Sequence, residues 1–148
     1  MRAPFQVLVL LYRQKNTEID FLILKRSDDL YWQFISGGGE DSEKPKEAAL
    51  RETNEEVGVK NISLFKLKSK TNISVEHVCG FAWGKDILLI PEFVFLAKIA
   101  FDTEIIISEE HIDFRWVKYN EALRILKWDS NKTALWESNY RILNNYWL

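Results

Sequence analysis

The residues best suited to chemistry in this sequence are three glutamates, Glu52, Glu55 and Glu56. Their spacing of i, i+3 and i+4 puts three carboxylates on one face of a helix, where they repel one another. A hard divalent cation would relieve that repulsion, because Mg²⁺ prefers oxygen ligands and keeps waters that substrate phosphates can replace. The pattern therefore predicts a Mg²⁺ site, at which Mn²⁺ could substitute, facing a small molecule that carries phosphates.

The element that must position these carboxylates is a helix predicted from Pro45 to Val57. Proline suits a first helical turn, because its missing N–H would have no partner there. Ala49, Thr53 and Val57 recur every four residues and are expected to face a core. Gly58 follows as the helix stop. The predicted helix therefore has one apolar face and one acidic face.

A longer pattern surrounds this helix: Gly, five residues, Glu, seven residues, then Arg-Glu-aliphatic-any-Glu-Glu-any-Gly-aliphatic. With this pattern the sequence resembles the Nudix hydrolases. Eight of the nine defined positions match, and Thr53 departs from the usual aliphatic residue. Threonine is close to valine in shape, so we expect a small effect on stability and none on chemistry. The matching positions are Gly37, Glu43, Arg51, Glu52, Glu55, Glu56, Gly58 and Val59.

The resemblance implies both a fold and a reaction. The fold would be an α/β protein of the Nudix type, an α/β/α sandwich with a mixed β-sheet, where periodicity alone predicts only α+β or α/β. The reaction would be hydrolysis of a nucleoside diphosphate linked to another group. Glu52 and Glu56 would be the first pair of metal ligands, and Glu55 would bind a second metal or orient water. The backbone carbonyl of Ser36, just before the pattern, would join the metal shell.

Four residues of the pattern are expected to be structural. In the family, the glutamate that matches Glu43 reaches back to the arginine that matches Arg51. The planar guanidinium of arginine can bind a carboxylate through two hydrogen bonds. Gly37 would let the backbone turn tightly and approach a ligand, and Gly58 would end the helix.

Residues outside the pattern point to one branch of the family. The combination WQ…GGGED…EEH…RW resembles the pyrophosphohydrolases that act on dihydroneopterin triphosphate or dATP. In that branch the glutamate that matches Glu110 contributes to the metal site, which makes it a candidate catalytic residue beside the three helix glutamates. The alternative is that Glu109 and Glu110 are solvated, as loop carboxylates commonly are. The general base is left open between the pattern and this loop.

Three residues are candidates for substrate binding. Lys25 and Arg26 end a predicted strand that leads toward the pattern, so either could bind phosphate or remain a solvated strand end. Trp32 could stack on a base, because aromatic faces suit nucleobases, whereas Phe34 is expected in the core. The two histidines are isolated, and no His/Cys spacing indicates zinc.

Composition limits the organisation and the partners. The 148 residues predict a single domain, 1–148, and 47% hydrophobic residues suffice for a substantial core. A net charge of −2 with both signs spread along the chain predicts no nucleic-acid partner. The longest N-terminal apolar run is too short to span a membrane, and the single cysteine, Cys79, favours a reducing cytoplasm. A homodimer is compatible with the resemblance, and the C-terminal aromatic residues are expected in the core or on a dimer surface.

Apolar runs and turn residues predict the remaining elements. Pro91 is expected to delay the start of one strand, and Asn120 is expected to cap a helix. The predicted strands are 5–12, 21–24, 62–68, 74–78, 93–100 and 114–118, with a short extension at 103–107, and the predicted helices are 121–127 and 130–144.

Three functions fit these observations. The first is a Mg²⁺-dependent pyrophosphohydrolase that cleaves a nucleoside or pterin triphosphate to monophosphate and pyrophosphate. The second is hydrolysis of a dinucleoside polyphosphate or of a nucleotide sugar of the ADP-ribose type. The third is a non-catalytic Nudix domain that binds a nucleotide as a sensor. The complete set of carboxylates argues against the sensor, as does a length that leaves no room for an attached DNA-binding domain.

Overall fold

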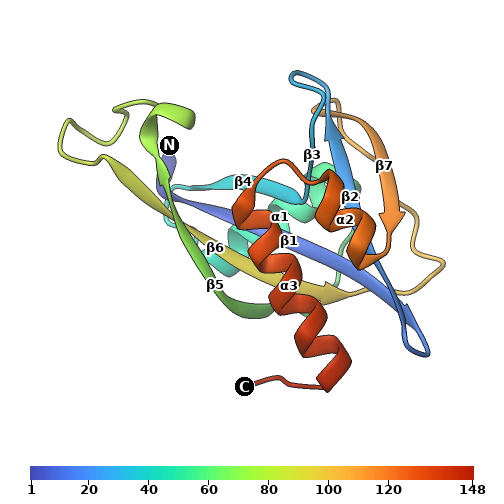
Figure 1. Ribbon diagram of the computed structural model, residues 1–148. Coiled ribbons are helices and arrows are strands. Elements are labelled where there is room, and N and C mark those ends of the chain that lie inside the picture. The colour runs from blue at the N-terminus through green and yellow to red at the C-terminus, as the bar shows by residue number, and fades with distance from the viewer.

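A seven-stranded mixed sheet lies at the centre of the structure, a computed structural model that describes residues 1–148 (Figure 1). The strands are β1 (Arg2–Lys15), β2 (Glu18–Arg26), β3 (Trp32–Gln33), β4 (Ile35–Glu40), β5 (Phe65–Ser74), β6 (Leu89–Lys98) and β7 (His111–Val117). The helices are α1 (Pro45–Val57), α2 (Tyr119–Ile125) and α3 (Asp129–Asn144), with a 3₁₀ turn at Val75–His77.

Strand β1 organises the sheet. It pairs in parallel with β6 and antiparallel with β2 and β4, while β7 pairs with β2. The side chains from Val7 to Leu11 are all buried. A strand covered on both faces tends to be a continuous apolar run, which is why the strand predicted at 5–12 is confirmed, although it extends further at both ends.

Helices cover both faces of the sheet, α1 on one side and α2 with α3 on the other (Figure 1). Alternate β1 residues face opposite sides: Leu8 packs in a cluster with Leu135 of α3, and Val9 packs in a second cluster with Ala49 of α1. These two cores confirm the predicted α/β/α sandwich with a mixed sheet.

Helix α1 has the predicted bounds and the predicted buried face. Ala49, Thr53 and Val57 are fully buried. The Thr53 hydroxyl donates to the carbonyl of Ala49 at 2.7 Å, so the polar atom that departs from the family pattern has a partner inside the helix. Gly58 follows in the left-handed conformation, with φ of 71°, and ends the helix as predicted.

Two strand predictions were wrong around β5 and β6. In place of the two strands predicted at 62–68 and 74–78 there is one strand, β5, which ends at Ser74, and most of the second segment is the 3₁₀ turn. Strand β6 begins before Pro91, which pairs with Asn72 of β5. Pairing with β1 starts only at Glu92, so Pro91 has a neighbouring strand on one side alone, where proline is tolerated.

Two further predictions were wrong, the strand at 103–107 and the start of the following helix. The segment 103–107 is not a strand, because its Ile106 N–H donates to the carbonyl of Val57 and so binds the end of α1. Helix α2 starts two residues earlier than predicted, with Lys118 rather than Asn120 at its N-cap. Helix α3 agrees with its prediction to within two residues at its start.

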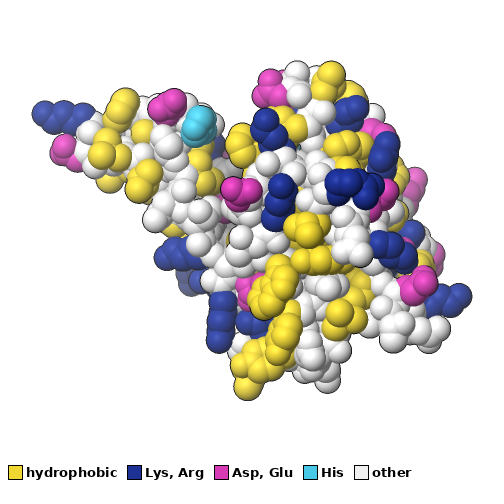
Figure 2. Space-filling model, viewed as in Figure 1, with side chains coloured by type: hydrophobic (Ala, Val, Ile, Leu, Met, Phe, Trp, Pro, Cys, Tyr) yellow, Lys and Arg dark blue, Asp and Glu magenta, His cyan; other side chains and the backbone are white.

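The exposed face of α3 carries large apolar side chains, which Figure 2 shows as a run of hydrophobic colour over that helix. Trp136 and Tyr140 are about half exposed and stack at 5.5 Å between ring centroids. The core-facing side of α3 is formed by Ala134, Leu135 and Ile142, which are buried. No helix is both long enough and apolar enough to cross a membrane.

Candidate active site

A cleft of about 930 Å³ opens between the far end of the β5–β6 pair and the β2–β3 side of the molecule, and Figure 2 shows the surface hollowed there. Its floor includes a row of residues that pair across four strands, Gly38 in β4, Gln6 in β1, Glu92 in β6 and Thr71 in β5. Glu52 and Glu110 also line it. The cleft therefore joins the sheet to the acidic helix.

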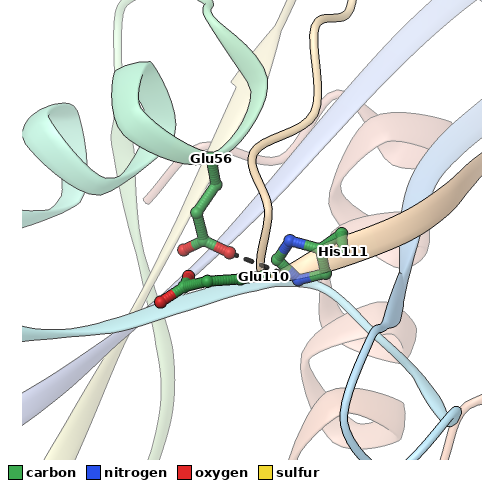
Figure 3. A group of neighbouring side chains, drawn as sticks. All are labelled: Glu56, Glu110 and His111. Carbon is green, nitrogen blue, oxygen red and sulfur yellow. Dashed lines mark ion pairs between the residues drawn. The ribbon is translucent and has the colours of Figure 1, made fainter.

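Glu56 and Glu110 meet at the C-terminal end of α1, together with His111 (Figure 3). Each of the three offers one ligand atom, and these atoms lie within 4.8 Å of one another. Glu56 is 1% exposed, and neither of its carboxylate oxygens has a hydrogen-bond partner. His111 Nε2 lies 3.5 Å from Glu56 Oε1. The fold therefore places the carboxylates of Glu56 and Glu110, which are far apart in the sequence, next to each other.

Backbone hydrogen bonds hold this meeting point together from both sides. The N–H of Ser108 donates to the carbonyl of Glu56 at 3.0 Å. The N–H and the hydroxyl of Ser27 donate to the carbonyl of Glu110, at 2.9 and 3.0 Å. The loop before β7 is thus fixed between α1 and the end of β2, which places Glu110 beside Glu56.

The local charges do not balance. Burial raises the pKa of Glu56 well above its usual value, and the nearby carboxylates of Glu52 and Glu110 raise that pKa further. Burial also raises the pKa of Glu52, against the opposing charge of Arg51. Burial lowers the pKa of His111 to about 4, so this histidine is neutral near pH 7 and supplies no positive charge. Two unpaired buried carboxylate oxygens beside further carboxylates fit a divalent cation.

Gly37 has a steric role at this site. A Cβ atom at this position would lie 2.1 Å from Cδ of Glu52, far inside van der Waals contact. Glycine thus leaves room for a carboxylate of the chain itself, where the sequence had suggested room for a ligand. Ser36 precedes it and lines the cleft.

Arg51 contacts three other carboxylates near the site, those of Glu43, Glu52 and Glu55. It donates two hydrogen bonds to Glu43, at 2.8 and 2.9 Å, and one to the carbonyl of Gly38 at 2.8 Å. The predicted contact between Glu43 and Arg51 is therefore present, and it holds the pKa of Glu43 below its usual value. Arg51 also contacts Glu52 at 3.0 Å and Glu55 at 3.1 Å. Glu55 is thus directed toward Arg51.

The three predicted substrate-binding residues divide into two groups. Arg26 lines the cleft, where it donates two hydrogen bonds to Asp28, at 2.9 and 2.7 Å. Lys25 and Trp32 pair with each other between β2 and β3 and are not among the residues that line the cleft. Their contact with substrate stays a prediction. Phe34 is fully buried, as predicted.

Two residues of the cleft region were missed by sequence reasoning. His111 was considered isolated, because its partner Glu56 is far away in the chain. Glu92 lies in the cleft at 4% exposure, and its Oε1 has no hydrogen-bond partner. Burial raises the pKa of Glu92 to about 7, opposed in part by the hydroxyl of Ser130. The sequence feature that could have indicated a role for Glu92 is its position as a charged residue within an otherwise apolar segment.

Residues 3–138 match the family model described as the NUDIX domain. The chain belongs to the Nudix hydrolase family. This Nudix hydrolase is 29% identical over 134 residues to the dihydroneopterin triphosphate diphosphatase of Haemophilus influenzae, covering 87% of this chain and 83% of that protein. It is 32% identical over 128 residues to the asymmetrical bis(5'-nucleosyl)-tetraphosphatase of Rattus norvegicus, covering 84% and 81%. A crystal structure described as a NUDIX hydrolase from Listeria monocytogenes matches with a TM-score of 0.87 and 38% identity, over 97% of both chains.

Replacing Arg51 tests whether it organises the acidic residues of the Nudix hydrolase. We expect Arg51→Ala to lower both turnover and the free energy of unfolding, the latter by roughly 1–3 kcal/mol, because Glu43 loses the two hydrogen bonds that Arg51 donates. Chemical denaturation measures the change. Arg124→Ala is the control, since Arg124 is exposed and 3.9 Å from its partner Glu121. An Arg51 variant as stable as this control would contradict the structural role.

The raised pKa of Glu92 predicts a pH-dependent effect of Glu92→Gln on stability. Between the ordinary glutamate pKa and about pH 7, the folded wild type keeps a proton at Glu92 that the unfolded chain has released. Wild-type stability therefore falls as pH rises through this window, and the variant escapes that loss. From pH 5 to pH 8, denaturation should show the variant gaining about 2.5 kcal/mol over wild type. A difference that does not change with pH would contradict the burial argument.

Proposed function

We propose that this Nudix hydrolase is a Mg²⁺-dependent pyrophosphohydrolase that cleaves a nucleoside or pterin triphosphate to the monophosphate and pyrophosphate. The observation that carries the proposal is the buried, unpartnered carboxylate of Glu56, which lies beside Glu110 and His111 next to a cleft of about 930 Å³. A relative of similar length is a dihydroneopterin triphosphate diphosphatase. The substrate would be a small molecule, with no nucleic acid or membrane involved.

In this proposal Glu52, Glu56 and Glu110 hold Mg²⁺ or Mn²⁺, with Glu55 and the Ser36 carbonyl as further ligands. When bound, such an ion neutralises charge on the phosphate oxygens and acidifies a coordinated water. Residues of the protein would supply the other contributions to catalysis. Phosphoanhydride cleavage depends mainly on positioning and charge stabilisation. The Arg26 guanidinium lines the cleft, and the N–H groups that it does not donate to Asp28 could bind a phosphate oxygen.

The proton of the attacking water needs an acceptor close to the buried carboxylates. Glu110 is exposed, lines the cleft and has a carboxylate oxygen within 4.8 Å of Glu56. Glu55 instead contacts Arg51 at 3.1 Å, and that ion pair competes with a role as base. The geometry therefore favours Glu110 as the group that takes the proton.

A second function is favoured by a specific observation. The relative from Rattus norvegicus is an asymmetrical bis(5'-nucleosyl)-tetraphosphatase, and its identity of 32% is slightly higher than that of the pterin enzyme. A dinucleoside polyphosphate would place a second nucleoside outside the cleft. The same acidic residues would serve that reaction, so the two functions differ in what the cleft binds.

Product analysis tests the proposal directly. Purified protein is incubated with Mg²⁺ and dihydroneopterin triphosphate, dGTP, dATP, a dinucleoside tetraphosphate or ADP-ribose, and products are identified by phosphorus NMR. We expect monophosphate and pyrophosphate from at least one triphosphate, and almost none from Glu56→Gln. Cleavage of the dinucleotide alone would replace the proposal with the second function. Binding of nucleotide without any cleavage would favour a sensor.

Replacing Glu110 separates a catalytic carboxylate from a solvated one. We expect Glu110→Gln to lower kcat by about 10²–10⁴-fold with KM changed only a few-fold, because a positioned base or metal ligand acts mainly in the transition state. Steady-state kinetics measure both constants. Glu109→Gln is the matched control, since Glu109 is the adjacent exposed carboxylate of the same loop. Equal kcat and KM values for the two variants would show that Glu110 is a solvated loop carboxylate with no role in catalysis.

Two wider predictions stay open alongside this proposal. A cytoplasmic location is consistent with the free, exposed thiol of Cys79. A homodimer would give the exposed aromatic residues of α3 a partner surface.

A further inference from the structure

The cleft contains a second acidic position, separate in sequence from the metal-binding candidates. Glu92 lies in β6, paired with Gln6 of β1 on one side and with Thr71 of β5 on the other. All three residues line the cleft, as do Ser130 and Asn131 at the start of α3. Glu92 is only 4% exposed, so its carboxylate belongs to the wall of the cleft and not to the surface.

Gln6 and Asn131 beside Glu92 already have hydrogen-bond partners, whereas one carboxylate oxygen of Glu92, Oε1, has none. The Gln6 amide donates to the Ser36 hydroxyl at 2.8 Å and accepts a hydrogen bond from Arg2. The Asn131 side chain accepts the N–H of Phe34 at 2.9 Å. Glu92 Oε1 is buried without any partner. Burying an unpaired carboxylate is costly, so this is the position where a bound molecule would gain most by donating hydrogen bonds.

The chemistry of a carboxylate limits what that molecule can be. An ionised carboxylate only accepts hydrogen bonds and repels phosphate, so its partner must present N–H groups. The best complement is a pair of adjacent N–H donors, as in the 2-amino-4-oxopyrimidine edge that guanine and pterins share. Adenine presents one donor beside one acceptor, which matches an amide such as glutamine better. A second metal site is disfavoured, because Glu92 is not part of the cluster of potential metal ligands.

The rest of the cleft suits a flat ring with a phosphate chain. Tyr31 and Trp128 form an edge-to-face pair with ring centroids 5.4 Å apart, and both line the cleft. Aromatic faces of this kind stack on bases and similar rings. Arg26 and Glu110 line the same cleft. A triphosphate can therefore direct its ring to β6 and its phosphates to α1.

We infer that Glu92 is a specificity-determining residue that accepts hydrogen bonds from the 2-amino-4-oxopyrimidine edge of a pterin or guanine triphosphate. This inference rests on the proposed function, because it takes a triphosphate as the substrate. The pKa of Glu92, raised by burial to about 7, leaves most of the carboxylate ionised at pH 8. Two N–H donors would then replace the hydration that burial removes.

The test compares wild type with Glu92→Gln at pH 8, using dihydroneopterin triphosphate, dGTP and dATP. Glutamine keeps the shape of glutamate but presents one donor and one acceptor. We expect kcat/KM for dihydroneopterin triphosphate and dGTP to fall at least tenfold, while the value for dATP is unchanged or rises. The pterin and guanine arms show which of the two rings the cleft prefers. Glu104→Gln, at an exposed loop position outside the cleft, should leave all three values as in wild type.

Equilibrium binding keeps this test independent of catalysis. Calorimetric titration of dGTP and dATP in the presence of a chelator measures recognition without hydrolysis, and melting curves verify that the variant is folded. Weaker dGTP binding by Glu92→Gln with dATP unaffected would support the inference even if no triphosphate is cleaved. An equal change for both nucleotides, or no change for either, would overturn it.

Discussion

The central constraint in this structure is a buried carboxylate without a counter-charge. Glu56 is almost fully inaccessible, and its oxygens lack hydrogen-bond partners. The histidine beside it is neutral near pH 7, because burial holds its pKa at about 4. Burying an isolated charge is among the most unfavourable arrangements in a protein. The chain tolerates it at the end of a helix that packing on the sheet holds in place, which is the arrangement expected where a cation completes the site.

The rest of the fold maintains that constraint. Helix α1 is held on the sheet by Ala49, Thr53 and Val57, which fixes the direction in which its glutamates point. The loop before β7 binds the last turn of α1 through backbone hydrogen bonds. Arg51 takes up some of the acidic charge by contacting Glu43, Glu52 and Glu55. A single guanidinium cannot balance all the carboxylates, so excess negative charge remains next to the cleft.

Local features of the sequence predicted local features of the structure well. The bounds of α1 follow from residues that are close in the chain, and the contact between Glu43 and Arg51 was implied by the resemblance to the family. The position of His111 beside Glu56 could not be predicted in this way, because it depends on the fixed loop before β7. Likewise, Pro91 was expected to delay the start of a strand, but β6 includes it because β6 has a neighbouring strand on only one side at that residue. The place of Glu92 in the cleft could not be predicted either, because it depends on the pairing of β6 with β1 and β5.

The relatives divide between a pterin triphosphate diphosphatase and a dinucleoside tetraphosphatase, and the acidic cluster does not distinguish them. What differs between such substrates is the ring and its distal groups, so the lining of the cleft carries the distinction. In this chain the lining combines the Glu92 carboxyl with its one unpaired oxygen, two aromatic rings and two arginines, Arg2 and Arg26. We therefore propose that specificity and catalysis depend on different strands and helices around one cleft.

The most direct test of the account is the effect of Mg²⁺ on thermal stability, measured without substrate for wild type and Glu56→Gln. An ion that binds only the folded state stabilises it further with each increase in concentration. We expect Mg²⁺ to raise the melting temperature of wild type progressively with its concentration and to have little effect on Glu56→Gln. The same rise in both proteins, or none in wild type, would contradict the claim that Glu56 lies at the centre of a metal site.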